Sequence, residues 1–152
     1  MHNAPETRPF DLIAPLLDVL WADGRMSFPQ VRAVDQVATR FGVDDVAMRI
    51  ARVPLADFDD AAPPATLRPV AYALAVWVAG MDGRLHPSEE AVLRHFAQWW
   101  ELAPEVERQA RRIALGMARV ARGRPTQTHL EALLRAARQL GSHDLLVGER
   151  AA

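Results

Sequence analysis

Two Asp-Gly pairs, at 23–24 and 82–83, carry the clearest chemistry of this sequence, because each follows an apolar stretch. Glu89 lies seven residues after the second aspartate, and Glu90 follows it. Carboxylate oxygens are the ligands that hard divalent cations prefer, so acidic side chains gathered at one corner of a fold could bind Ca²⁺, Mg²⁺ or Mn²⁺. We therefore predict a weak, water-rich divalent-cation site with the ligands Asp23, Asp82 and Glu89, and with Glu90 as a further candidate.

The same residues also have a purely structural interpretation. A glycine after an apolar helix is the usual left-handed helix terminator, and an aspartate in such a turn accepts backbone N–H bonds. Glu89 falls at the third position of the helix expected after His86, where a carboxylate is favoured by the positive end of the helix. Both interpretations, a cation site and a pair of capped turns, remain open on the sequence.

Gln30 takes the place in the first Asp-Gly region that Glu89 takes in the second, 59 residues later. The segment 27–30, Ser-Phe-Pro-Gln, is a capping-box pattern, in which the first and last side chains bond each other's backbone N–H groups. Glutamine caps a helix nearly as well as glutamate but is a much poorer cation ligand. The substitution therefore favours capping at this position, or a cation site with one side degraded.

A calcium-binding EF-hand loop is excluded. The segment 82–89 matches the second half of such a loop, with an acid, a glycine, an apolar residue and a final glutamate. The two leading ligand positions fall on Val78 and Gly80, which offer no side-chain oxygen. In the first region they fall on Val19 and Trp21, which offer none either.

The chain contains an internal repeat, which appears when the sequence is shifted by 59 residues against itself. The Asp-Gly-Arg triplet at 23–25 then falls on the triplet at 82–84, and apolar residues fall on apolar residues. The matched apolar pairs are Met26 with Leu85, Val34 with Leu93, Val37 with Phe96, Phe41 with Trp100 and Val43 with Leu102. The repeat predicts two units of helix, Asp-Gly turn and helix, at about 8–53 and 67–115.

Apolar residues recur at helical spacing along most of the chain, and no stretch combines strand-like alternation with hairpin turn signals. We therefore expect an all-α fold, a bundle of about seven helices that forms a single domain over residues 1–152. The expected helices run at about 9–22, 28–41, 44–53, 67–81, 87–101, 104–122 and 128–140. The nearly uncharged helix at 67–81 should form the buried centre, and the proline-rich stretch at 54–66 should be a linker.

Composition and motifs exclude several classes of function. The formal net charge of −1 gives no strong attraction to nucleic acid, and the longest uncharged stretch, thirteen residues at 69–81, is too short for a transmembrane segment. The start of the chain lacks the pattern of a secretory leader, and the absence of cysteine permits a reducing compartment. The five histidines show no metal-ligand spacing, and no nucleophile elbow, Walker loop or dinucleotide fingerprint occurs. We expect a non-enzymatic, cytoplasmic protein.

A second hypothesis gives the chain a metal-free protein-interaction surface. Trp99 and Trp100 are adjacent, and neighbouring helical positions point about 100° apart, so both cannot face the same core. One of the two should then contact a partner. The helix that follows carries a local basic patch, although its arginines favour a solvated amphipathic helix whose arginine stems cover apolar surface. The expected partner surface consists of Trp99, Trp100, Arg108, Arg111 and Arg112.

The paired turns resemble the signature of the TerB-like tellurite-resistance family, whose relatives include the N-terminal domain of DjlA-type co-chaperones. The resembling segments, 22–26 and 81–85, are apolar helix ends followed by Asp-Gly and then an aliphatic residue, with a glutamate opening the helix after the second. The resemblance covers about 9–115. It implies an all-α bundle of two pseudo-repeated units, in which the acidic residues of both turns meet at a divalent-cation site. The residues that match are Asp23, Asp82 and Glu89.

The same resemblance implies an association with bacterial metal or stress responses. We expect a cation-responsive or protein-binding module in a tellurite, metal or envelope stress response, which would act on a protein partner. Gln30 departs from the family's pattern. A J-domain is not attached, because His86 and Pro87 are followed by Ser88 instead of the aspartate of the His-Pro-Asp signature.

Overall fold

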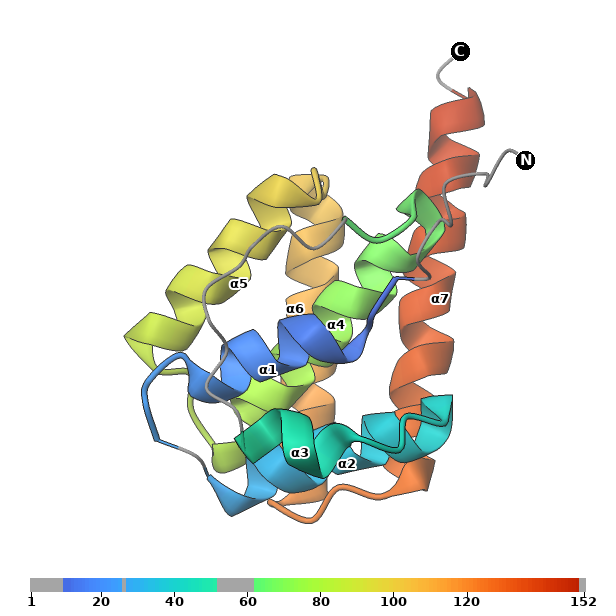
Figure 1. The fold of residues 1–152 in the computed structure, drawn as a ribbon. Helices are drawn as coiled ribbons and strands as arrows, with labels where there is room; N and C mark the ends of the chain where they lie inside the picture. Colours follow the sequence, from blue (N-terminus) through green and yellow to red (C-terminus); the bar gives the residue numbers. More distant parts are fainter. Residues whose placement is uncertain (1–9, 26, 52–61, 151–152) are drawn as a thin grey trace, which may run out of the picture.

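The computed structural model describes residues 10–25, 27–51 and 62–150. Within these ranges all regular secondary structure is helical (Figure 1). The described α-helices are α1 (Ile13–Trp21), α2 (Phe28–Phe41), α3 (Val46–Ala51), α4 (Arg68–Ala79), α5 (Pro87–Trp99), α6 (Pro104–Ala121) and α7 (Gln127–Arg150), with the 3₁₀ turns η1 (Ala65–Leu67) and η2 (Gly80–Asp82). The prediction of an all-α fold of about seven helices is therefore confirmed for the described residues.

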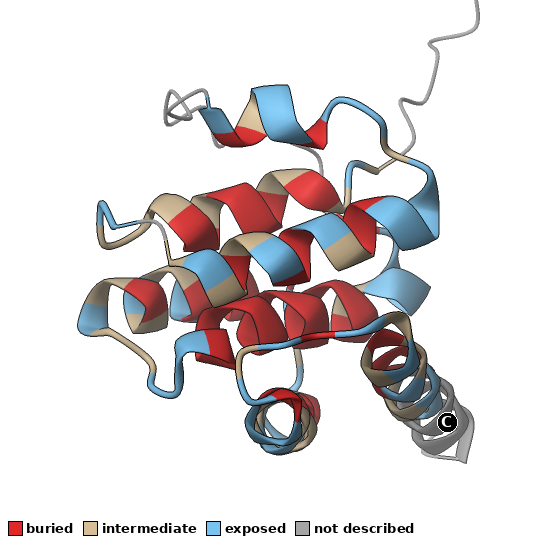
Figure 2. Ribbon diagram, turned by 90° about the horizontal axis from the view of Figure 1, so that it is seen from below, coloured by how far each residue is buried: buried red, intermediate tan, exposed pale blue. Residues whose placement is uncertain are grey.

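The central helix of the bundle is α4. Every residue from Pro69 to Ala79 is buried, and α4 contacts α1, α2, α5, α6 and α7. In Figure 1 it crosses the middle of the molecule, and in Figure 2 the buried residues lie along the inward faces of the surrounding helices. A helix that is apolar on all sides is stable only where other helices cover it. The prediction of a buried centre is confirmed for 69–81, whereas Leu67, in η1, is exposed.

Small residues bring α6 close to the end of α4. Alanines at every fourth position of α6 are buried, among them Ala110, Ala114 and Ala118. At Gly80, in η2, an added Cβ would lie 2.8 Å from Cδ2 of Leu115 and 3.4 Å from Cβ of Ala118. This close approach holds η2, and with it the second Asp-Gly turn, against α6.

Several helix boundaries differ from the expected ones. Pro9, the expected start of the first helix, lies outside the described residues, and α1 begins at Ile13, where Oδ1 of Asp11 accepts a hydrogen bond from the backbone N at 3.0 Å. Most of the expected linker, 54–61, also lies outside the described residues. The last helix is longer than the expected 128–140, since α7 runs for 24 residues. Within the described part of the chain, no helix has both the length and the apolarity that a bilayer span requires.

Candidate functional site

Two Asp-Gly turns hold the predicted carboxylates. Gly24, after α1, has a φ of 70°, and Gly83, after η2, has a φ of 98°, in the left-handed region that favours glycine. Oδ1 of Asp23 accepts a hydrogen bond from the backbone N two residues further on at 3.0 Å, and Oδ1 of Asp82 does the same at 3.5 Å. One oxygen of each aspartate therefore closes its own turn. The second oxygen, Oδ2, is left for other partners.

His86 lies between the two turns. It is the N-cap of α5, and its Nε2 lies 3.2 Å from Oδ2 of Asp82 and 3.8 Å from Oδ2 of Asp23. The sequence does not indicate His86 as a candidate ligand, because the five histidines show no ligand spacing among themselves. The signal that could have found it is its place immediately before Pro87 at the start of a helix, four residues after Asp82.

Glu89 is fully buried in the first turn of α5. Its Oε1 accepts a hydrogen bond from the backbone N of His86 at 3.1 Å, and its Oε2 accepts one from Nε2 of Gln30 at 2.7 Å. Burial raises the pKa of the Glu89 carboxyl above its ordinary value, against the lowering effect of these two hydrogen bonds. Burial penalises the ionised form of this carboxyl, and a cation placed beside it would stabilise that ionised form.

Gln30 is buried as well, and its side chain crosses from α2 to the end of α4 and the start of α5. Its Nε2 donates to the carbonyl oxygen of Ala79 at 3.2 Å and to Glu89 at 2.7 Å, so both amide hydrogens have acceptors. The backbone N of Gln30 donates to Oγ of Ser27 at 3.3 Å, which is the first half of the expected capping box. The amide nitrogen of the side chain is directed at Glu89. Gln30 therefore orients the buried glutamate.

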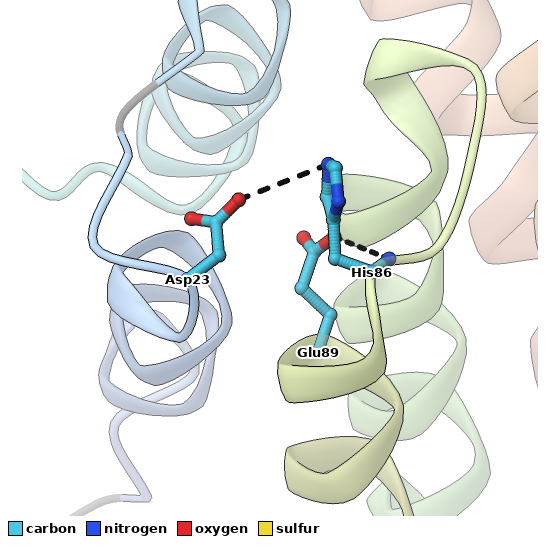
Figure 3. A group of neighbouring side chains, drawn as sticks. All are labelled: Asp23, His86 and Glu89. Atoms are coloured by element: carbon cyan, nitrogen blue, oxygen red, sulfur yellow. Dashed lines mark hydrogen bonds and ion pairs between the residues drawn. The ribbon is translucent and has the colours of Figure 1, made fainter.

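Asp23, His86 and Glu89 form a group of side chains that could hold a metal ion. One ligand atom from each lies within 4.8 Å of the others. Figure 3 shows the three side chains gathered at the start of the helix that carries Glu89. Asp23 comes from the turn after α1, whereas His86 and Glu89 come from the start of α5. Asp82 borders the group through its contact with His86. Carboxylate oxygens and an imidazole nitrogen are ordinary ligands of divalent cations, so the chemistry of this donor set fits such an ion.

Glu90, the further candidate ligand, faces a different neighbour. Both of its carboxylate oxygens accept hydrogen bonds from Nη2 of Arg111 on α6, at 2.6 and 2.7 Å. Adjacent positions of a helix point about 100° apart, so Glu89 and Glu90 project in different directions from α5. Glu90 and Arg111 therefore form an ion pair between α5 and α6.

The arginines of the expected partner surface differ in their surroundings. Besides its ion pair with Glu90, Arg111 lies beside Tyr72, whose hydroxyl donates to Oε1 of Glu107 at 3.4 Å. Burial raises the pKa of Tyr72 to about 12. Arg108 and Arg112 are both exposed, and Arg108 forms an ion pair at 2.5 Å with Glu105 one turn earlier. Arg111 is thus engaged inside the bundle, while Arg108 and Arg112 stay on the surface.

The two adjacent tryptophans are separated by the fold. Trp100 is 1% exposed and stacks on Phe96 with ring centroids 4.6 Å apart and an interplanar angle of 1°. Trp99 is partly exposed, with its ring centroid 5.7 Å from that of His95. Trp100 is the buried one of the pair, whereas Trp99 is partly exposed but also packs against the core. The surface expected for a partner therefore loses Trp100 and retains Trp99.

The described residues thus bring together a buried glutamate, two turn aspartates and a histidine. Comparison of the chain with protein-family models, with curated proteins and with solved structures found no match in any of the three.

Proposed function

We propose that this chain is a non-enzymatic helical domain of the TerB-like type that binds a divalent cation where its two Asp-Gly turns meet. The observation that carries the proposal is the group of Asp23, His86 and Glu89, whose ligand atoms lie within 4.8 Å of one another. Two of the three, Asp23 and Glu89, are residues that the sequence pattern selects independently. Their approach from distant segments supports the acidic corner that the TerB-like resemblance implies.

The contacts across this corner support a relation between two pseudo-repeated units. Positions 30 and 89 are equivalent under the shift of 59 residues, and their side chains share a hydrogen bond of 2.7 Å. Positions 23 and 82 are also equivalent, and both aspartates contact His86. Equivalent positions meet where two related units pair about a two-fold axis. The cation site would then lie close to the pseudo-two-fold axis.

A bound cation would act on this domain by neutralising repulsion between the carboxylates. It would link Asp23, in the turn between α1 and α2, to Glu89 at the start of α5. The surface around the turns would then differ between the free and the loaded domain, and a protein partner could distinguish the two. We place this module in the cytoplasm, in a bacterial tellurite, metal or envelope stress response.

The test is a cation titration of the metal-stripped protein, followed by the backbone amide shifts. Ca²⁺, Mg²⁺ and Zn²⁺ are added to wild type and to a double variant with Asp23→Asn and Asp82→Asn. Asparagine keeps the oxygen that closes each turn, so the variant removes charge with little change of backbone. We expect shifts at Gly24 and Gly83 in wild type that disappear in the double variant.

A matched control is Asp35→Asn, which removes one exposed carboxylate of α2. This variant should respond to cations as wild type does. A folded wild-type protein whose amide shifts do not respond to millimolar cation would overturn the proposed cation site.

A metal-free interaction domain is the second candidate, and one observation favours it. Each turn aspartate already uses an oxygen to close its own turn, which accounts for both residues without an ion. The partner surface would then contain Trp99, Arg108 and Arg112. The two arginines line a surface depression on α6. The absence of any cation response, together with a partner whose binding is weakened by Arg108→Gln and Arg112→Gln, would select this candidate.

A further inference from the structure

We propose that the site takes a nitrogen-accepting transition-metal cation of the Zn²⁺ type, with Nε2 of His86 as a ligand, in preference to Ca²⁺ or Mg²⁺. This inference rests on the cation site proposed above and names its ligand class. The carboxylates alone predict a hard cation. The position of His86 changes that prediction.

The number of free oxygens in the corner is small. Of the six carboxylate oxygens of Asp23, Asp82 and Glu89, four already accept a hydrogen bond from the protein. Of the other two, Oδ2 of Asp82 is hydrogen-bonded to Nε2 of His86 at 3.2 Å, and Oδ2 of Asp23 lies 3.8 Å from the same nitrogen. A cation that binds Nε2 would therefore take the place of the proton on this nitrogen, which is released to solvent. Ca²⁺ takes about 6 to 8 oxygen ligands, so this corner offers it a poor shell.

The same atoms suit a cation of low coordination number. Zn²⁺ is bound by about four ligands, drawn from imidazole nitrogen, carboxylate oxygen and water. The corner supplies one nitrogen from His86, Oδ2 of each aspartate, and an oxygen of Glu89 through the lone pair that its single hydrogen bond leaves unused. Transition metals bind imidazole well, whereas Ca²⁺ and Mg²⁺ prefer carboxylate, carbonyl and water oxygens.

The spacing of the donors also agrees with a small cation. In a tetrahedral zinc site with bonds of about 2.0 to 2.1 Å, neighbouring ligand atoms are about 3.3 Å apart. Nε2 of His86 lies 3.2 Å from Oδ2 of Asp82 and 3.8 Å from Oδ2 of Asp23. These two pairs need only small side-chain adjustments, whereas the ligand atoms of the whole group, which lie within 4.8 Å of one another, must draw closer around the ion.

Gln30 is the positioning residue of this arrangement. Hydrogen bonds to ligand atoms orient them and raise metal affinity, and their loss costs about 10- to 100-fold in affinity. The amide of Gln30 holds Oε2 of Glu89, while the carbonyl of Ala79 holds the amide. Gln30 is therefore not itself a ligand. Its role is to fix the orientation of Glu89, the buried ligand of the group.

The test measures the affinity of the metal-stripped full chain for Zn²⁺, Co²⁺, Ca²⁺ and Mg²⁺, by calorimetry and, for Co²⁺, by visible absorption. Wild type should bind Zn²⁺ and Co²⁺ at least about 100-fold more tightly than Ca²⁺ or Mg²⁺. His86→Gln should weaken Zn²⁺ binding by at least about tenfold and leave the weak Ca²⁺ affinity unchanged. His95→Gln, on an exposed position of the same helix, is the matched control and should behave as wild type.

A second readout does not depend on any variant. In the wild-type protein, Zn²⁺ should shift the ring resonances of His86 while those of His95 stay in place. Ca²⁺ and Zn²⁺ binding with equal affinity, or Zn²⁺ binding that leaves the His86 ring unaffected, would overturn this inference and leave the cation site standing. Failure of every cation to bind would overturn the cation site itself.

Discussion

Nε2 of Gln30 donates a hydrogen bond of 2.7 Å to Oε2 of Glu89, and the two residues lie 59 positions apart, the same interval that separates Asp23 from Asp82. The contact is buried, and it joins α2 to α5 beside the two Asp-Gly turns. A neutral amide opposite a buried carboxylate allows the pair to form without a second negative charge.

Replacing that amide by a carboxylate should destabilise the metal-free protein. In Gln30→Glu two buried carboxyl groups would face each other and the donor to Ala79 would be lost, which should lower the free energy of unfolding by about 3 kcal/mol at pH 7. The pair would retain a proton to a higher pH than in the unfolded chain, so the loss should be smaller at pH 5. Urea unfolding at the two pH values measures this, and Gln98→Glu, on the exposed side of α5, should change little. Equal effects of the two substitutions would contradict the structural role of Gln30.

Tyr72 should ionise far above the usual range. It is the only tyrosine of the chain, so the phenolate absorbance reports it alone, and the midpoint should lie at about 12. The pKa of Tyr72 is raised from 10.0 in the folded protein, so the contribution of its neutral hydroxyl to the free energy of unfolding is fully present below about pH 10. This contribution, roughly 2 to 3 kcal/mol in total, is lost as the pH rises towards 12. The chain contains neither lysine nor cysteine, so Tyr72→Phe should flatten the stability curve between these pH values. A midpoint near 10 would show that the hydroxyl is not buried.

Substitution of the glycine in the second Asp-Gly turn should destabilise the protein. At Gly83, with φ of 98°, an added Cβ meets no atom within 4 Å, so Gly83→Ala carries only the conformational cost of roughly 1 to 2 kcal/mol. Gly116 is a matched control, since a Cβ there also meets nothing within 4 Å but the residue lies inside α6. Gly116→Ala should stabilise the protein by about 0.5 to 1 kcal/mol. Thermal unfolding of the two variants should therefore shift in opposite directions.

The two adjacent tryptophans should differ sharply in their effect on stability. Trp100→Ala removes a buried ring that stacks on Phe96, and should cost about 3 to 5 kcal/mol. Trp99→Ala removes a partly exposed ring and should cost about 1 kcal/mol. Chemical unfolding measures both. Comparable losses would mean that Trp99 is as deeply packed as its neighbour.

Local patterns were sufficient to predict much of the fold. The apolar spacing predicts the helices, and the uncharged stretch at 67–81 predicts which of them is central, because burial follows from the absence of a polar face. Asp-Gly pairs after apolar stretches predict both turns. For Trp99 and Trp100 the 100° step between neighbours predicts that one is buried, but which one depends on the rotation of α5 against the core, which only tertiary packing sets.

The candidate site was predicted in part for a similar reason. Asp23 and Glu89 stand out through the repeat and the signature, and both belong to the group that could hold an ion. His86 was missed, since it shows no ligand spacing with the other histidines and its ring enters the site from the N-cap of α5. The direction of the Gln30 side chain was also missed, because its partners lie 49 and 59 residues away and no local pattern encodes them.

The hydrogen bond from Gln30 to the carbonyl of Ala79 has a consequence for how the protein opens. The last carbonyls of a helix have no intrahelical donor, and here the final residue of α4 receives one from a side chain of α2. Fraying of the central helix at this end must break a buried contact to another helix, so the end of α4 and the start of α2 belong to one cooperative unit. Their amide protons should therefore exchange with solvent through a common opening event.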